Sequence, residues 1–195
     1  MNKKYTWCFM GQAEGRPTRK AMLSELKKLS GKHFENHNMG WQTPDMIEQS
    51  EYKKILSDSI FVPCPKGNSS VDSFRFCETL EAGSIPIPEK GDGYWDKLLG
   101  PDHPFYIQAN SDWKGITEQL ESLLSNEKIL AGYNKKVSDW WGNHKIKLRQ
   151  TFSSIISHKP AKTLDLNSLD ERRKEFSKLS IHNKTEQRNN MWEIL

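Results

Sequence analysis

The sequence predicts an α/β fold in which a Rossmann-like parallel sheet is flanked by helices. Short apolar runs typical of buried strands, such as residues 5–10 and 60–64, alternate along the chain with segments whose apolar residues recur at helical spacing. Strands and helices that alternate at these lengths are typical of a parallel sheet with helical crossovers. Such sheets bind ligands beyond the carboxyl ends of their strands.

The first half of the chain supplies strands and helices in alternation. The first strand, 5–10, ends at Gly11, and Pro17 suits the first turn of the helix that follows. This helix carries its apolar residues at helical spacing, at Met22, Leu23, Leu26 and Leu29. The next predicted elements are a weaker strand near 33–38, a helix over 44–58 and a strand over 60–64.

The second half begins with a short helix after residue 72 and a strand over 85–88. Pro86 and Pro88 cannot donate to a ladder, so this strand belongs at an edge or a strand end. Glycines and prolines punctuate 89–104, which we expect to be a loop. The last predicted elements are a strand at 105–108, a helix over 112–125 and a helix over 126–157 that Gly142 should break or bend.

The domain organisation follows from length and composition. We expect a Rossmann-like domain over 1–158 and a polar helical tail over 159–195. The net charge of +4 is mild, and the basic residues are interleaved with acidic ones along the chain. This pattern favours solvated helix faces and argues against nucleic acid as a partner.

The cysteines and the apolar segments indicate a compartment. Cys8, Cys64 and Cys77 lie in apolar runs with no C-x-x-C spacing, which predicts buried, reduced thiols and a cytoplasmic protein. No Cys or His pair has the spacing of zinc ligands, so no metal site is predicted. No apolar run approaches the roughly 20 residues that cross a bilayer, so we expect no membrane association.

The most informative segment is 57–87, which reads as strand, small-polar loop, helix and strand. The loop at 66–70 lets a ligand approach the backbone of Lys66 and Gly67 closely, although an ordinary turn explains it equally well. Ser73 can cap the helix. Arg75 and Glu78 lie three residues apart and share one helix face, either as a surface ion pair or as ligands for phosphate and sugar hydroxyls.

Arg16 and Arg19 bracket the start of the first helix. The helix dipole disfavours cations at this end, so an anion such as a diphosphate beside them would explain their presence, with solvated arginines as the alternative. Because ligands bind at the carboxyl ends of parallel strands, the loops 11–19, 65–73 and 88–96 should share one rim.

Three linked blocks, 59–67, 72–78 and 80–87, resemble the exostosin-like glycosyltransferases. They read Ser-Ile-Phe-Val-Pro-Cys-Pro-Lys-Gly, Asp-Ser-Phe-Arg-Phe-Cys-Glu and Leu-Glu-Ala-Gly-Ser-Ile-Pro-Ile. The family pattern is roughly S-x-F-x-x-x-P-x-G followed by D-S-x-R-x-x-E-A-L-x-A-G-x-I-P-V. Thr79 and Ser84 stand where the family usually has Ala and Cys, and both are small enough to leave the site intact.

The resemblance implies the donor-binding half of a GT-B fold and metal-independent, cofactor-free transfer of a sugar from a nucleotide-sugar donor to a glycan acceptor. It implies that Glu78 binds the ribose hydroxyls and that Arg75 and Ser73 face the diphosphate. Arg16 or Arg19 would assist the leaving group by electrostatic stabilisation. The expected catalytic residues are Arg19 and Arg75, and the expected substrate-binding residues are Arg16, Lys66, Gly67, Ser73 and Glu78.

The length of the chain departs from that family. A complete GT-B enzyme carries an acceptor domain before the donor half, and the general base is expected there. This chain starts only a few residues before its first strand, so we expect either one half of a split or truncated enzyme or a partner chain that supplies the acceptor domain. Two other functions stay open: a non-catalytic nucleotide-sugar-binding or partner-binding module, and a basic nucleic-acid-associated accessory protein.

Overall fold

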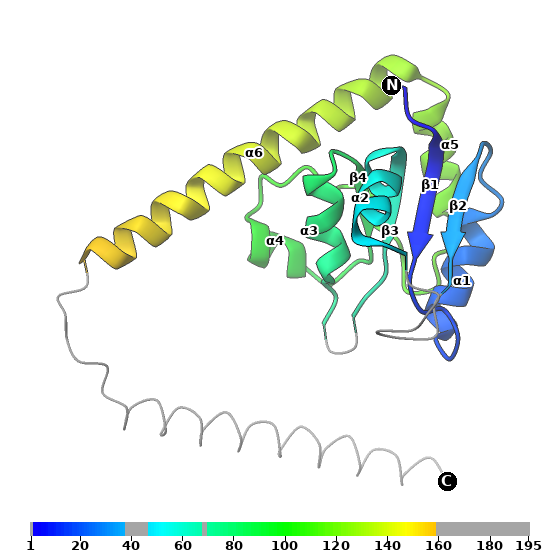
Figure 1. The fold of residues 1–195 in the computed structure, drawn as a ribbon, viewed down its shortest axis with the longest axis horizontal. Coiled ribbons are helices and arrows are strands. Elements are labelled where there is room, and N and C mark those ends of the chain that lie inside the picture. The colour runs from blue at the N-terminus through cyan, green and yellow to red at the C-terminus, as the bar shows by residue number, and fades with distance from the viewer. Residues whose placement is uncertain (1, 38–46, 68–69, 159–195) are drawn as a thin grey trace, which may run out of the picture. The chain divides into compact units, whose positions relative to one another are not determined.

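The structure, a computed structural model, describes residues 2–37, 47–67 and 70–158. Within these residues, parallel strands form one sheet in the order β2-β1-β3-β4 (Figure 1). The strands are β1 (Tyr5–Met10), β2 (His33–Asn36), β3 (Ser59–Cys64) and β4 (Ile85–Pro88). The predicted Rossmann-like α/β class is confirmed, as is the edge position of the proline-containing β4.

The register brings the ends of three strands together. Strands β1 and β3 are each six residues long and start at the pair Tyr5 and Ser59, so Met10 and Cys64 end side by side. Cys64 in turn pairs with Pro88, the last residue of β4. We call this end of the sheet the carboxyl edge and the opposite end, where these strands begin, the amino edge. Ligand sites of such sheets lie at the carboxyl edge.

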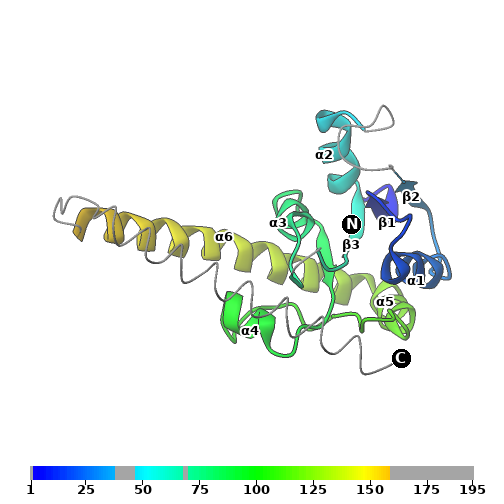
Figure 2. The ribbon, with the colours of Figure 1, turned by 90° about the horizontal axis from the view of Figure 1, so that it is seen from below.

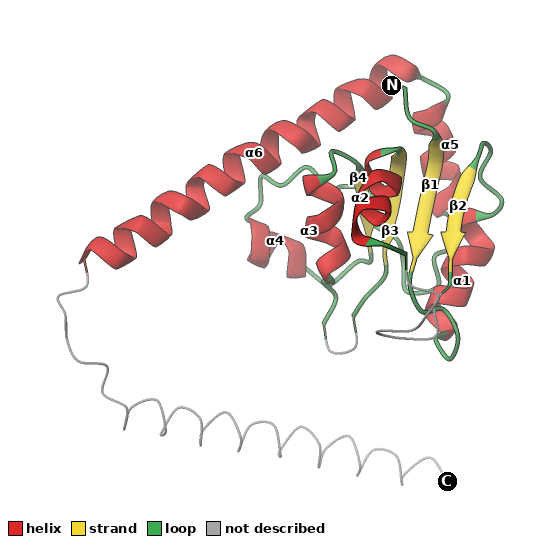
Figure 3. Ribbon diagram, in the orientation of Figure 1, coloured by secondary structure: helices red, strands yellow, loops and turns green. Residues whose placement is uncertain are grey.

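Helices cover both faces of the sheet. Figure 2 shows α2 (Gln49–Ser57) and α3 (Phe74–Glu81) on one side, with α1 (Pro17–Leu26) and α5 (Ile116–Leu124) on the other, and Figure 3 shows the strands between them. The helices turn apolar residues inward, including fully buried Met22 of α1 and Leu120 of α5. A parallel sheet needs this cover because both of its faces are apolar.

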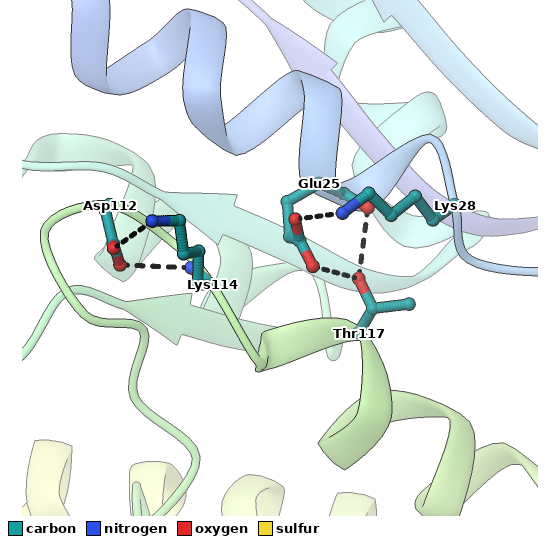
Figure 4. Close-up of polar contacts among 5 residues, drawn as sticks. All are labelled: Glu25, Lys28, Asp112, Lys114 and Thr117. Atoms are coloured by element: carbon teal, nitrogen blue, oxygen red, sulfur yellow. Dashed lines mark hydrogen bonds and ion pairs between the residues drawn. The ribbon is translucent and has the colours of Figure 1, made fainter.

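A buried polar contact joins α1 to α5. Figure 4 shows Thr117 of α5 facing Glu25 of α1: the hydroxyl donates to the Glu25 carbonyl at 3.0 Å and lies 3.4 Å from Oε1. Lys28 Nζ lies 2.6 Å from Glu25 Oε2. In the loop before α5, the Lys114 N–H donates to Asp112 Oδ1 at 3.2 Å. The Thr117 contact holds the C-terminal end of α1 against α5.

Two predictions about the region after β4 are wrong. The expected loop over 89–104 contains helix α4 (Tyr94–Leu99), which buries Trp95 and directs its indole N–H to the Glu89 carbonyl at 2.8 Å. The expected strand at 105–108 is reduced, within the described chain, to a single bridge between Glu89 and Ala109. Phe105 and Ile107 are buried as a strand pattern suggests, but their backbone does not continue the ladder.

The predicted helix boundaries also need correction. Helix α5 starts at Ile116 and not at 112, because Trp113 and Gly115 have φ of 60° and 77°. Helix α2 starts at Gln49, and residues 44–46 of the predicted helix lie outside the described residues.

Helix α6 (Glu127–His158) runs through Gly142 without a break, contrary to prediction. A glycine costs a helix only about 1 kcal/mol, which packing can outweigh. The Trp140 ring packs edge-on against Phe105 at 5.1 Å, and the Trp141 indole N–H donates to Glu81 at 3.1 Å. These two contacts hold the helix immediately before the glycine.

Burial of the cysteines follows the prediction in part. Cys8 and Cys64 are buried and free, whereas Cys77 lies on the exposed face of α3. The prediction that Cys77 is buried is therefore wrong, because its apolar neighbours Phe74 and Phe76 point in different directions: Phe76 into the core and Phe74 into solvent.

The chain divides into two compact units, Met1–Ile146 and Lys147–Leu195. The first contains the sheet and the covering helices, together with buried Leu130, Tyr133 and Val137 of α6. The predicted tail over 159–195 lies outside the described residues, and its division from 1–158 stays a prediction. No helix in the described ranges is long and apolar enough to cross a membrane.

Candidate functional site

Three loops meet around a cavity at the carboxyl edge. The cavity has a volume of about 200 Å³ and is lined by segments that follow β1, β3 and β4. Its lining residues are Gly15, Arg16, Pro17, Thr18, Arg19, Pro65, Lys66, Gly67 and Glu89. The prediction that these three loops share one rim is confirmed. Four of the predicted site residues line the cavity: Arg16, Arg19, Lys66 and Gly67.

Arg16 and Arg19 stand at the start of α1 as predicted. Arg16 is the N-cap residue, Pro17 occupies the first turn, and the first turn contains no acidic residue. The Arg19 guanidinium donates to the Gln12 carbonyl at 2.8 Å, which orients it across the loop after β1. Burial lowers the pKa of Arg19, and the nearby charges of Arg75 and Arg16 lower it further, while Glu89 raises it. The Arg19 guanidinium therefore lies within electrostatic range of both Arg16 and Arg75.

Lys66 and Gly67 bring the loop after β3 to the same cavity. The Gly67 N–H donates to the Ser70 carbonyl at 2.9 Å and closes a turn. A Cβ on Gly67 would lie 3.0 Å from the Asp72 carbonyl oxygen, so a residue with a side chain would crowd this turn. The Lys66 N–H donates to Glu89 Oε1 at 3.1 Å, which ties this loop to the residue after β4.

Arg75 does not line the cavity. Its Nη2 donates to the Met10 carbonyl at 2.6 Å, and its guanidinium lies 4.8 Å from the Phe9 ring centre. The same Nη2 lies 2.7 Å from the place of a Cβ on Gly11, whose φ of 152° also favours glycine. Arg75 thus holds the end of β1 and the turn that leads to Arg16 and Arg19.

Ser73 and Arg75 each leave a buried polar atom unsatisfied. Ser73 is the N-cap of α3, but its hydroxyl makes no capping bond, so the predicted cap is absent. Among the described residues, Ser73 Oγ and Arg75 Nε are buried without a hydrogen-bond partner. Unpaired buried polar atoms are costly, and a ligand oxygen is one way to satisfy them.

Glu78 is exposed on α3 and contacts Tyr52 of α2. The Tyr52 hydroxyl donates to Glu78 Oε2 at 2.6 Å. Burial and this hydrogen bond both raise the pKa of Tyr52. Glu78 and Arg75 form no ion pair with each other in the described structure, so the surface-pair interpretation of these two residues is wrong. Glu78 does not line the cavity.

Two residues of this region were missed by sequence reasoning. Glu89 lines the cavity and is only 3% exposed, yet it was assigned to a loop. Its place directly after a buried strand was the available signal. Tyr52 lies in the helix predicted over 44–58, and the sequence gives no sign that its hydroxyl reaches Glu78.

The arrangement suits an anionic ligand. Positive charge comes from Arg16, Arg19 and Lys66. Within the described chain, none of these three side chains forms an ion pair with a carboxylate. The described ranges contain no group of three or more His, Cys, Asp or Glu side chains placed to hold a metal ion. In comparisons with known proteins, no family model matches this chain and no curated protein matches it.

Proposed function

We propose that this chain is the nucleotide-sugar-binding half of an exostosin-like glycosyltransferase, which takes a sugar from a nucleotide donor for transfer to a glycan. One observation carries the proposal: two arginines and a lysine line one cavity at the carboxyl edge and have no carboxylate partner in the described structure. Arg16 and Arg19 are partly buried, and Glu89, the carboxylate in the same lining, makes no ion pair with them in the described structure. A diphosphate in the cavity would supply the missing ion-pair partner.

The residue types favour a diphosphate over a single carboxylate. Guanidinium groups bind phosphate oxygens in a bidentate manner, and Lys66 adds a point charge from a different loop. Gly67 lines the cavity without a side chain, which lets a ligand approach its backbone closely. Arg75 acts differently from the expectation, because its bond to the Met10 carbonyl makes it a positioning residue for the arginine loop.

The nucleoside would extend along the carboxyl edge toward α3. Glu78 retains one carboxylate oxygen beyond the bond to Tyr52, and a carboxylate accepts hydrogen bonds from ribose hydroxyls. The Arg75 charge lowers the pKa of both Arg19 and Tyr52, so Arg75 is near both residues. A ligand with phosphates in the cavity and a ribose near Glu78 would therefore follow one continuous edge of the sheet.

Transfer would use the same cations. As the glycosidic bond to the donor breaks, negative charge grows on the departing nucleoside diphosphate. Fixed cations aimed at that charge stabilise the transition state without reorganising. The general base and the acceptor would come from a partner chain or domain.

Titration calorimetry with uridine, guanosine, adenosine and cytidine diphosphates tests the binding step. We expect at least one of them to bind with a dissociation constant below the millimolar range. Binding to none of the four contradicts the proposal. Nucleotide-sugar turnover, measured with and without candidate partner chains, then separates a transferase from a non-catalytic module. Tighter, salt-sensitive binding of RNA or DNA would instead favour the nucleic-acid-associated alternative.

A further inference from the structure

The cavity contains a carboxylate beside its cations. Glu89 follows β4, is 3% exposed and lines the cavity together with Arg16, Arg19 and Lys66. A site for phosphate alone gains nothing from a carboxylate, since the two anions repel each other. Burying a carboxylate is also costly unless hydrogen bonds compensate for the lost water.

The protein holds this carboxylate in place. Glu89 Oε1 accepts the Lys66 N–H at 3.1 Å and the Trp113 indole N–H at 3.3 Å. The Glu89 carbonyl accepts the Trp95 indole N–H at 2.8 Å, so two buried tryptophans bind one residue. Trp113 has a φ of 60°, a backbone conformation that is strained for a bulky residue. Such support is typical of a preorganised binding group.

Glu89 is not simply the counter-ion of the arginines. Within the described residues, no Lys or Arg nitrogen lies in ion-pair contact with its oxygens, whereas other carboxylates such as Glu14 and Glu25 do have such contacts. The Glu89 charge nevertheless acts on Arg19. The carboxylate and the cationic side chains therefore line one cavity without an ion pair between them in the described structure, and a ligand in the cavity could contact both.

We infer that Glu89 accepts a hydrogen bond from a hydroxyl of the donor's sugar, beside the phosphates held by Arg16, Arg19 and Lys66. This inference rests on the proposed function. A carboxylate is an acceptor only, so its ligand partner must be a donor next to an anion. The sugar of a nucleotide donor presents hydroxyls at that place. Glu89 would thus select a nucleotide sugar over a nucleoside triphosphate, whose third phosphate it repels.

The test compares three kinds of ligand with the same base: a nucleoside diphosphate, its sugar derivatives and the triphosphate. The base is that of the diphosphate that binds in the calorimetry described above. With the wild-type chain we expect at least one sugar derivative to bind more tightly than the triphosphate. In Glu89→Gln, which keeps the size and an acceptor oxygen, that preference should fall about tenfold, because a hydrogen bond to a charged acceptor is lost. Triphosphate binding should become tighter and diphosphate binding should be unchanged or tighter.

Glu14→Gln is the matched control, since Glu14 is an exposed carboxylate in the loop after β1, beside Arg16, and pairs with Lys20 outside the cavity lining. It should leave the ligand preference unchanged. Equal weakening of all three ligands by Glu89→Gln would show that Glu89 only positions the Lys66 loop, and would overturn the inference. A wild-type chain that binds the diphosphate but shows no preference for any sugar derivative would also overturn it and leave the proposed function standing.

Deoxy-sugar donors provide a second measurement on the wild-type protein, which does not depend on the variant folding. Removal of the sugar hydroxyl that donates a hydrogen bond to Glu89 should weaken binding about tenfold. If no single deoxygenation weakens binding, the inference is overturned. If the wild-type chain binds no nucleotide of any kind, the proposed function fails and the inference fails with it.

Discussion

The two edges of the sheet use polar residues in opposite ways. At the amino edge, Lys3 Nζ contacts the Ser57 and Gly83 carbonyls. Ser84 Oγ lies 2.6 Å from the Leu56 carbonyl and 2.7 Å from the Ser59 carbonyl. Every one of these side chains bonds back to the protein's own backbone, as buried polar groups normally do.

At the carboxyl edge, polar side chains keep charge and hydrogen-bonding capacity that the protein itself does not use. Arg16 and Lys66 line a cavity without a carboxylate partner in the described chain, and the Glu89 carboxylate takes only N–H donors. The difference separates two kinds of polar residue in one sheet. Those at the amino edge should affect stability, and those at the carboxyl edge should affect ligand binding. The following predictions test this separation.

The largest expected effect is on binding at the carboxyl edge. Arg16→Ala combined with Arg19→Ala should weaken nucleoside diphosphate binding on the order of a hundredfold or more, since each charged hydrogen bond contributes about 1.5–3 kcal/mol. Calorimetry measures the loss. Lys20→Ala with Lys28→Ala removes the same charge from exposed residues that pair with carboxylates, and should have little effect. A similar loss in both double variants would show that net charge alone attracts the nucleotide.

The amino edge should respond in stability. Ser84→Ala removes a hydroxyl that donates to one of two buried carbonyls, of Leu56 or Ser59, which should lower the free energy of unfolding by about 1–3 kcal/mol. Urea denaturation measures this change, and nucleotide binding should stay as in the wild type. Ser125→Ala removes an exposed hydroxyl bonded to the Ser122 carbonyl and should cost much less. Loss of nucleotide affinity in folded Ser84→Ala would break the separation of the two edges.

A smaller effect should distinguish the parts of the carboxyl edge from each other. Glu78→Gln should weaken nucleoside diphosphate binding about tenfold, because a neutral amide is a poorer acceptor for ribose hydroxyls. Inorganic pyrophosphate, which has no ribose, should bind the variant and the wild type equally well. Glu51→Gln on α2 is the exposed control. If pyrophosphate binding falls as well, Glu78 acts on the cavity and not on the nucleoside.

Much of this edge could be predicted because it depends on local patterns. The apolar runs predicted the strands, and Pro86 and Pro88 predicted the edge position of β4. Pro17 predicted the start of α1 and so the place of Arg16 and Arg19. The rule that parallel strands end together then joined the loops. Each of these inferences needs only neighbours in the sequence and the geometry of one sheet type.

The contacts within the edge could not be predicted in this way. Arg75 bonds to Met10 across 65 residues, and the Trp113 indole reaches Glu89 across 24 residues. Such pairs depend on how helices and loops pack, which periodicity does not encode. The same limit explains why α4 was missed, since burial of Trp95 against Glu89 stabilises it in a segment rich in glycine.

A further expected effect, which depends on pH, concerns Cys64, the last residue of β3. Burial raises the pKa of the Cys64 thiol from its ordinary 9.0 to about 12, although the charge of Arg75 acts to lower it. Between pH 9.0 and about 12, the native state therefore keeps the thiol proton that the unfolded chain releases. The resulting contribution to stability is fully present below pH 9.0 and is lost as the pH rises through about 12.

Comparison with Cys64→Ala isolates this contribution, because the loss of packing in the variant does not depend on pH. The stability advantage of the wild type should be constant at neutral pH and should fall by about 1 kcal/mol for each pH unit above 9.0. Urea denaturation at a series of alkaline pH values measures it. A constant advantage across that range would mean that Arg75 stabilises a native thiolate, and that Cys64 belongs with the ligand-facing charges of the carboxyl edge and not with the core.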